Sequence, residues 1–233
     1  MGRFNQQRII RKIELEKLLT QIRPLLIPKA DLEQYTTPEK IMANILHLIA
    51  YSNSDIVGKT ILDLGCGTGR ISLGASFLGA REVVGIDIDK IAIKMAYENS
   101  KRLNLEKNIN WITGDISVIR GHFDTVIQNP PFGIQKRHAD RKFLKKALEI
   151  GKTVYSIHSH PSFDKTLLKH FRKNPNTLIR VNPSPFLQKF IEKYGGSIRA
   201  VYSMIITIPR MFNFHKKNQY SFVIDLYWIE HCD

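Results

Sequence analysis

The chain has 233 residues, 43% of them hydrophobic, which is enough for one packed core, so residues 1–233 are expected to form a single domain. Lys and Arg number 35 against 21 Asp and Glu, a formal net charge of +14. This excess favours a polyanionic partner, because each neutralised phosphate releases counterions. A membrane surface is the weaker candidate, because no strongly apolar face accompanies a basic one. Clustering favours nucleic acid over a merely solvated basic surface, through Lys136, Arg137, Arg141, Lys142, Lys145 and Lys146.

Compartment signals point to the cytoplasm. The two cysteines, Cys66 and Cys232, do not make a disulfide framework. The first residues lack the apolar stretch of a signal peptide, and Gln6 stands where a myristoylation signal has Ser or Thr. No apolar run approaches the roughly 20 residues of a membrane span. We expect a soluble, cytoplasmic protein without membrane contact, and no metal site is expected.

The N-terminal part, residues 1–30, is expected to be a helical extension. Residues 6–19 have the spacing of a basic amphipathic helix whose apolar side carries Ile9, Ile10, Ile13 and Leu18. Pro24 follows and ends the helical pattern. This helix is predicted to cover the core.

Thr37 and Pro38 are typical of a helix start, with threonine as N-cap and proline as first helical residue. The helix that follows is predicted to bury a face of Ile41, Ile45, Leu48 and Ile49. On this pattern alone, Gln34 and Thr37 serve only as a loop residue and a cap.

The middle of the chain alternates strand and helix patterns. Strands are predicted at residues 60–64, 82–87, 109–113, 123–128 and 153–158. Helices are predicted at residues 70–78, 89–103 and 140–149. The alternation indicates a parallel sheet with right-handed crossovers, in which ligands bind beyond the carboxyl ends of the strands.

The last third changes character. Helices are predicted at residues 163–171 and 185–194, and the Pro- and Asn-rich segment 174–185 between them is predicted as a loop. Two β-rich runs, 197–208 and 221–229, are close enough to form a hairpin. The predicted fold is therefore α/β, with a seven-stranded, mostly parallel sheet that ends in an antiparallel β-hairpin. The hairpin tip is basic and carries aromatic side chains, through Phe214, His215, Lys216 and Lys217.

A glycine loop, D-L-G-C-G-T-G at residues 63–69, follows the first strand. Such a loop lets backbone amides approach a ligand closely. It misses the dinucleotide fingerprint G-x-G-x-x-G, because position 70 is Arg70. Asp87 ends the next strand, where a carboxylate can accept both ribose hydroxyls. A plain turn residue is the alternative for Asp87, and the loop before it favours the ribose role.

A second motif follows the fourth strand, formed by Asn129, Pro130, Pro131 and Phe132. An amino group conjugated to a ring is a poor nucleophile, and the Asn129 amide oxygen and the Pro130 carbonyl can accept its two N–H groups. Phe132 can stack on a planar base, an interaction worth about 1–3 kcal/mol. Positioning then carries most of the catalysis. As a bare string the motif could also be a turn with Phe132 in the core; its place behind a strand favours the functional interpretation.

The glycine loop and G-I-D-I-D resemble motifs of class I S-adenosylmethionine-dependent methyltransferases. The resemblance implies that Asp63 lies near the methionyl amino group, that Asp87 holds the ribose, and that Asp115 meets the adenine amino group. It also implies that further residues line the cofactor pocket, namely Gly65, Gly67, Thr68, Arg70, Ile88 and Ile116.

N-P-P-F is similar to the [DNS]-P-P-[FYW] motif of amino-methyltransferases, which act on adenine N6, cytosine N4 or glutamine. Together with L-E-Q-Y-T-T, F-L-K-K-A-L-E, V-Y-S-I-H and F-H-K-K, it resembles the methyltransferase-like 5 family and its archaeal relatives. This implies N6-methylation of adenosine in small-subunit ribosomal RNA. The resemblance also implies that Gln34 and Thr37 contact the methionine end of the cofactor and that residues 214–217 approach the RNA.

The resemblance also implies a small zinc-binding activator protein. The strand around Trp111 is expected at a sheet edge, where a partner can add a strand. Residues 165–184 are longer than the family usually has, and the N-terminus is extended and basic. No segment here supplies the separate target-recognition domain of DNA adenine methyltransferases, which favours RNA.

Two alternatives stay open. A protein glutamine methyltransferase acting on a translation factor also uses N-P-P with an aromatic residue, although it does not need the +14 charge. A non-catalytic RNA-binding assembly factor could retain the fold, although the intact motif argues against it. A dehydrogenase is disfavoured by Arg70 and by residues 129–132.

Overall fold

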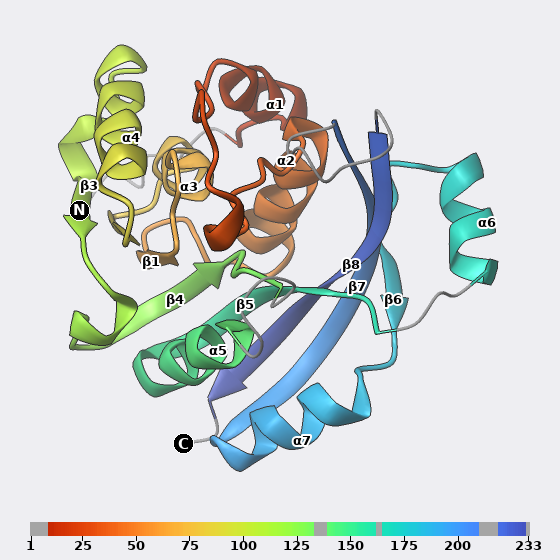
Figure 1. Ribbon diagram of the computed structural model, residues 1–233. Coiled ribbons are helices and arrows are strands. Elements are labelled where there is room, and N and C mark those ends of the chain that lie inside the picture. The colour runs from red at the N-terminus through yellow and green to blue at the C-terminus, as the bar shows by residue number, and fades with distance from the viewer. Residues whose placement is uncertain (1–8, 133–138, 162–164, 210–218, 232–233) are drawn as a thin grey trace, which may run out of the picture.

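A computed structural model describes residues 9–132, 139–161, 165–209 and 219–231. Its centre is one eight-stranded sheet in the order β3-β2-β1-β4-β5-β8-β7-β6 (Figure 1). The pairs from β3 to β5 are parallel, and β5–β8, β8–β7 and β7–β6 are antiparallel. The strands are β1 (Thr60–Leu64), β2 (Glu82–Asp87), β3 (Ile109–Thr113), β4 (Phe123–Gln128), β5 (Gly151–Ser159), β6 (Ile179–Val181), β7 (Gly196–Pro209) and β8 (Gln219–His231).

Helices cover both faces of the sheet. In Figure 1, α1 to α4 lie on one face, and α5 and α7 lie on the other. The helices are α1 (Lys12–Thr20), α2 (Glu39–His47), α3 (Arg70–Phe77), α4 (Lys90–Arg102), α5 (Ala139–Ile150), α6 (Lys165–Lys173) and α7 (Pro185–Lys193). Short helical turns are η1 (Ala30–Leu32), η2 (Leu48–Ser52), η3 (Glu106–Asn108) and η4 (Ile116–Val118).

Two apolar clusters hold these layers to the sheet. One packs α1, α2 and α3 against the sheet, and Leu19, Leu46 and Ile61 are fully buried in it. The other packs α5 and α7 against the opposite face, around Leu144 and Tyr227. Burying one such aliphatic side chain contributes about 1.5–3 kcal/mol. The packing keeps the carboxyl ends of the parallel strands in fixed register.

The predicted α/β fold with a terminal antiparallel hairpin is confirmed, and the number of strands is not. The sheet has an eighth strand, because residues 179–181 of the expected loop pair with Val201–Ser203 of β7. Three residues flanked by proline and asparagine are too few to show strand periodicity.

The N-terminal helix buries only part of the face that the sequence predicts. It begins at Lys12, and Leu15, Leu18 and Leu19 face the core, whereas Ile9 and Ile13 are exposed. Leu18 is buried as predicted and Ile10 packs partly buried against the core, so the expected stripe is wrong only at Ile9, which precedes the helix, and at Ile13.

Thr37 does not cap α2. The N-cap residue is Pro38, without a side-chain cap hydrogen bond, and the Thr37 hydroxyl is engaged elsewhere, by Asn129. Ile41, Ile45 and Ile49 are buried as predicted, and Leu48 is half-buried. Among the described residues, no helix has the length and apolar character to cross a membrane.

Candidate active site

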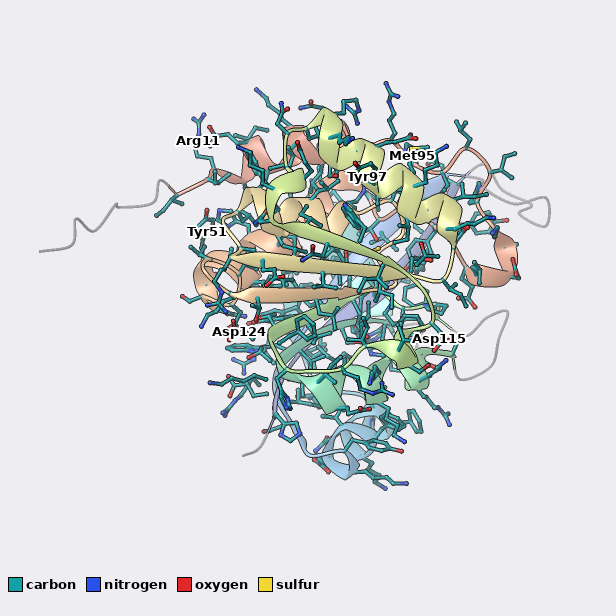
Figure 2. The ribbon with its side chains drawn as sticks, turned by 90° about the vertical axis from the view of Figure 1, so that its left-hand side faces the viewer. Arg11, Tyr51, Met95, Tyr97, Asp115 and Asp124 are labelled. Atoms are coloured by element: carbon teal, nitrogen blue, oxygen red, sulfur yellow. The ribbon has the colours of Figure 1, made fainter. Side chains whose placement is uncertain are left out.

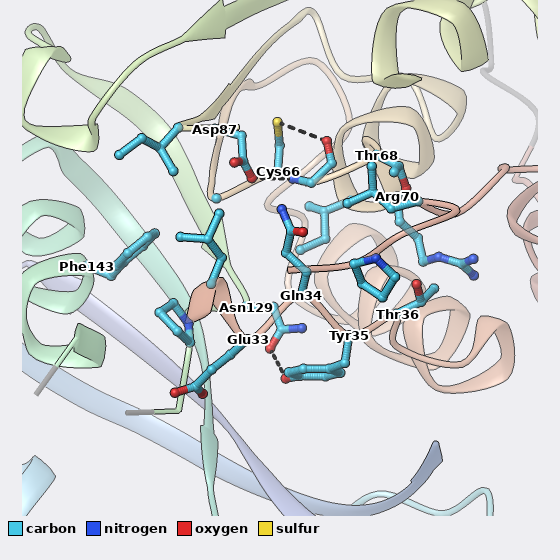
Figure 3. Close-up of a pocket in the computed structure, with 18 of the residues that line it drawn as sticks. Glu33, Gln34, Tyr35, Thr36, Cys66, Thr68, Arg70, Asp87, Asn129 and Phe143 are labelled. Carbon is cyan, nitrogen blue, oxygen red and sulfur yellow. Dashed lines mark hydrogen bonds between the residues drawn. The ribbon is translucent and has the colours of Figure 1, made fainter. Parts of the chain in front are cut away.

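A cavity of about 470 Å³ opens at the carboxyl ends of β1 to β4, closed on one side by the segment before α2 (Figure 3). Figure 2 faces the β3 edge and shows the two ends of the sheet, with Asp115 at the cavity end and Asp124 at the other. Twelve of the predicted site residues line the cavity, namely Gln34, Thr37, Gly65, Gly67, Thr68, Arg70, Asp87, Ile88, Asp115, Ile116, Asn129 and Pro131.

Three predicted residues lie beside the cavity and do not line it, namely Asp63, Pro130 and Phe132. The four hairpin-tip residues, Phe214, His215, Lys216 and Lys217, fall outside the described residues. The cavity therefore brings together the glycine loop and the Asn129 motif, which are about 60 residues apart in sequence.

The glycine loop turns sharply between β1 and α3. Gly69 is the N-cap of α3 at φ +87°, and a Cβ there would lie 2.6 Å from Cη2 of Trp111. Gly67 has φ +54°, and a Cβ there would meet nothing within 4 Å. Only glycine adopts such left-handed backbone without cost. The loop consequently presents bare backbone to the cavity.

Asp87 fixes the glycine loop to the end of β2. Its Oδ2 accepts a hydrogen bond from Gly67 N (2.8 Å), and its Oδ1 accepts one from Asp89 N (2.8 Å). Burial raises the pKa of the Asp87 carboxyl, and both backbone hydrogen bonds oppose that shift. Each carboxylate oxygen retains a free lone pair for a ligand hydroxyl.

Asp63 lies beneath the loop. It is fully buried, and its Oδ2 accepts hydrogen bonds from Ser72 N (3.0 Å) and Ser72 Oγ (2.7 Å). Its other oxygen, Oδ1, has no hydrogen-bond partner among the described residues. Burial raises the pKa of Asp63 to about 7. An unpartnered buried carboxylate oxygen suits a cationic ligand group.

The segment before α2 is tied to the start of α4. Gln34 Nε2 donates to Asp89 Oδ2 (2.9 Å), and Gln34 Oε1 accepts from Lys29 N (2.8 Å). Lys29 also pairs with Asp89 at 3.1 Å. Gln34 thus lines the cavity with an amide that is already engaged in holding the segment in place.

Asn129 is held between two hydroxyl groups of the same segment. Its Oδ1 accepts a hydrogen bond from the Tyr35 hydroxyl (2.7 Å), which Figure 3 marks with a dashed line. Its Nδ2 donates to Thr37 Oγ1 (3.0 Å). Burial raises the pKa of Tyr35 far above its usual range, so the phenol stays a neutral donor. The two contacts hold the Asn129 amide group in place at the edge of the cavity.

Phe132 belongs to an aromatic cluster beside Asn129. Its ring centroid lies 5.3 Å from that of Tyr35 and 5.9 Å from that of Phe222. Tyr35 and Phe222 meet edge to face at 6.3 Å. Phe132 is half-buried.

Three charged residues of the lining, Asp115, Lys142 and Arg70, take part in ion pairs. Lys142 Nζ lies 2.6 Å from Asp115 Oδ2, and this contact holds the pKa of the Asp115 carboxyl far below its usual range. Arg70 pairs with Glu39 at 3.2 Å.

Among the lining residues that sequence reasoning missed are Tyr35, Lys142 and Phe143. Tyr35 lies inside the L-E-Q-Y-T-T motif, but nothing in its spacing connects it with residue 129. Phe143 packs against Gly65 from α5, where a Cβ on Gly65 would lie 3.0 Å from Phe143 Cε1. Only tertiary packing brings these pairs together.

The features of the cavity fit S-adenosylmethionine. The bare glycine loop and the carboxylate at the end of β2, both in the cavity lining, match the nucleoside part of this cofactor. The fold and site define a class I S-adenosylmethionine-dependent methyltransferase, and S-adenosylmethionine is its cofactor.

Comparisons with known proteins narrow the class. A family model described as ribosomal protein L11 methyltransferase (PrmA) matches residues 31–130. An uncharacterized protein of Methanocaldococcus jannaschii is 38% identical, over 95% of both chains. The rRNA N6-adenosine-methyltransferase METTL5 of Danio rerio is 32% identical, over 91% of this chain and 95% of the relative.

A solved structure from Pyrococcus horikoshii, described as a candidate RNA methyltransferase, is 36% identical. It superimposes with a TM-score of 0.78 and covers 97% of this chain and 100% of its own. The chain belongs to the family of rRNA N6-adenosine methyltransferases that includes METTL5.

Proposed function

We propose that the protein transfers a methyl group from S-adenosylmethionine to N6 of an adenosine in ribosomal RNA, specifically that of the small subunit. The observation that carries the proposal is the position of Asn129. Its amide lines the same cavity as the glycine loop and is oriented by Tyr35 and Thr37. The relatives named as rRNA N6-adenosine methyltransferases and the +14 charge support an RNA substrate.

Asn129 and Pro130 position the adenine amino group. An amide oxygen has two lone pairs, so Asn129 Oδ1 can accept one N6–H while it still accepts from Tyr35. We assign the acceptor for the other N6–H to the Pro130 carbonyl and base stacking to Phe132, both of which lie beside the cavity and do not line it. Because the lone pair of this nitrogen is delocalised into the ring, alignment rather than deprotonation supplies most of the catalysis.

The cofactor-binding residues act before that step. Asp87 holds the ribose hydroxyls, Asp115 and Ile116 meet the adenine, and Gln34 and Thr37 face the methionine end. S-adenosylmethionine supplies a sulfonium methyl that is already activated for displacement, so no general base is required before attack. The target adenosine must be unstacked to enter, which structured ribosomal RNA with splayed-out bases permits.

The test is incubation with tritiated S-adenosylmethionine and deproteinised small-subunit RNA, followed by nucleoside mapping. The expected product is N6-methyladenosine at one site. Label in large-subunit RNA alone would contradict the small-subunit assignment, and label in protein alone would contradict the RNA assignment.

One observation favours a second candidate, a protein methyltransferase. The L11 methyltransferase model matches residues 31–130, which include the cofactor loop and Asn129. This match ends before α5 and the hairpin, so it covers the half of the chain that binds the cofactor. The same labelling reaction with ribosomal proteins present separates the two candidates.

We also propose an activator protein at β3. This strand ends the sheet, and an edge strand offers free backbone groups to a partner strand. The Trp111 ring itself packs toward Gly69 and Gly85, so the proposal depends on the strand rather than on the indole. If the protein stays monomeric in light scattering when mixed with the zinc-binding activator of the same cell, the idea fails.

The hairpin tip at residues 214–217 is proposed to approach the RNA, on its basic and aromatic composition. A cytoplasmic location is proposed because the substrate is ribosomal RNA.

A further inference from the structure

Basic side chains and aromatic rings alternate along α5 and α7. Cζ of Arg141 lies 4.5 Å from the ring centroid of Phe186. Nζ of Lys145 lies 5.4 Å from the ring centroid of Tyr194, and Nζ of Lys193 lies 5.7 Å from it. Phe190 connects the two rings, at 6.2 Å from Phe186 and 4.9 Å from Tyr194. We call this set the α5–α7 ladder, made of Arg141, Lys145, Phe186, Phe190, Lys193 and Tyr194.

The cations of the ladder keep their charge available. Among the described residues, no carboxylate lies within ion-pairing distance of Arg141, Lys145 or Lys193. Their neighbours on α5 differ, because Lys142 pairs with Asp115 (2.6 Å) and Lys146 pairs with Glu149 (3.0 Å). A cation over a ring is positioned without being neutralised. Less side-chain entropy is then lost when it meets an anion.

The ladder starts on α5, the helix that forms part of the cavity wall. Ala139, Lys142 and Phe143 of α5 line the cavity, and Arg141 lies between them in sequence. Lys145 is one helical turn further along α5, about 6 Å at 1.5 Å per residue. Figure 1 shows α5 and α7 side by side on one face of the sheet. Arg141 and Lys145 thus lie on the same helix as the cavity lining, on the side of α5 that faces the rings of α7.

The aromatic rings of the ladder indicate which class of anionic ligand it binds. Phe186 is 48% exposed although it is a large apolar side chain. Free phosphate or an acidic peptide gains little from such a ring. A nucleic-acid strand offers both phosphates for the cations and bases or sugars for the ring.

We propose that the α5–α7 ladder binds the RNA strand that flanks the target adenosine. This rests on the proposed RNA methylation and adds the surface that holds the substrate outside the cavity. Arg141 and Lys145 contact phosphates, and Phe186 stacks on a base.

The chain offers a matched control on the opposite layer. Nζ of Lys101 on α4 lies 4.7 Å from the ring centroid of Tyr97, and Figure 2 shows Tyr97 on α4 above the sheet. Lys101→Ala removes one positive charge from the same kind of pair, away from α5 and α7, and compares with Lys145→Ala alone.

The first experiment measures binding of an in vitro transcribed small-subunit RNA fragment at several salt concentrations. Arg141→Ala combined with Lys145→Ala should weaken binding tenfold or more and reduce the slope of log K against log salt by about 1.4–1.8. Phe186→Ala should weaken binding several-fold with the slope unchanged, because no charge is removed. Lys101→Ala should bind like wild type. Equal loss in Lys101→Ala, or competition by polyglutamate as strong as by RNA, would overturn the proposal.

The second experiment compares methylation of the long RNA with that of a short adenosine-containing oligonucleotide that reaches only the cavity. The double variant should lose kcat/KM for the long RNA and keep it for the oligonucleotide. Equal loss for both would place the defect at the methyl-transfer site and overturn the ladder. Absence of RNA methylation by wild type would instead contradict the proposed function, while the binding experiment still tests the ladder.

Discussion

Asn129 owes its orientation to two hydroxyl groups from a segment more than 90 residues earlier in the chain. The Tyr35 hydroxyl polarises the amide oxygen, and Thr37 accepts from the amide nitrogen. An amide that could rotate would present N–H instead of an acceptor to the adenine amino group. The two hydroxyls therefore hold the amide group in place beside the substrate in our mechanism.

Replacing Tyr35 tests this role. Tyr35→Phe keeps the ring against Phe132 and removes the donor to Asn129. A hydrogen bond contributes about 0.5–1.5 kcal/mol net, so the single-turnover rate is expected to fall by about 2- to 12-fold. Cofactor affinity, measured by calorimetry, should change little. A wild-type rate would show that the hydroxyl does not position the amide.

Thr37 supplies the matched comparison. Thr37→Ser keeps an acceptor for Asn129 Nδ2 and should keep most activity, whereas Thr37→Val removes it at nearly constant volume and should lose activity. Equal rates for the two variants would count against the hydroxyl contact.

Asp63 makes stability depend on pH. Burial raises its pKa from 3.8 to about 7, against the hydrogen bonds from Ser72. The folded state therefore binds this proton more tightly than the unfolded state. The stabilisation from the bound proton is fully present below the pKa of Asp63 in the unfolded state, and it is lost as the pH rises through the pKa of Asp63 in the folded state. Relative to Asp63→Asn, the wild-type free energy of unfolding should fall between about pH 4 and about pH 7, by up to about 1.4 kcal/mol per pH unit. Urea denaturation of both proteins measures it, and parallel pH curves would contradict the assignment.

At the scale of elements, the loop between β1 and α3 has two roles, because it packs against neighbouring elements and also lines the cavity. Its glycines have different neighbours, since Gly69 lies under the Trp111 ring while Gly67 faces open space. Gly69 is required for the packing of β3 on α3, and Gly67 is required for a ligand to reach the backbone of the loop.

Alanine at these two positions should separate stability from binding. Gly67→Ala is expected to cost about 1–2 kcal/mol of stability through its left-handed backbone alone. Gly69→Ala should cost at least about 2–4 kcal/mol, because a Cβ also collides with Trp111. Gly67→Ala should weaken the cofactor more than it destabilises the chain. Denaturation midpoints and cofactor calorimetry measure the two effects, and equal destabilisation would refute the distinction.

Local motifs can be predicted from sequence, and long-range contacts cannot. Residues 63–69 and 129–132 carry their signal within a few residues, so their place at strand ends is predictable and the cavity lining agrees with it. The contact of Tyr35 with Asn129 depends on a fold that brings distant segments together, and no spacing encodes it. The buried face of α1 is not predictable either, because the helix start at Lys12 carries no strong cap signal.

At the scale of the whole molecule, the net charge and the long β7 and β8 strands are both consistent with RNA as the partner. The chain carries +14, and the long strands β7 and β8, of 14 and 13 residues, lead to the basic segment between them. We propose that the cations of this segment and those of the α5–α7 ladder both contribute to RNA binding.

Removing the lysines of the tip should show this in the salt dependence. Lys216→Ala with Lys217→Ala is expected to lower RNA affinity and to reduce the slope of log K against log salt by about 1 for each phosphate that the variant no longer neutralises. Filter binding across a salt series measures it. An unchanged slope would exclude the tip from the RNA interface.

The mechanism as a whole is tested by Asn129→Ala. Methyl transfer from tritiated S-adenosylmethionine to small-subunit RNA and cofactor affinity are measured on the same preparation. Because loss of positioning costs on the order of a hundredfold or more, transfer should fall to background while cofactor affinity stays close to that of wild type. Wild-type turnover in this variant would contradict the positioning of the adenine amino group by Asn129.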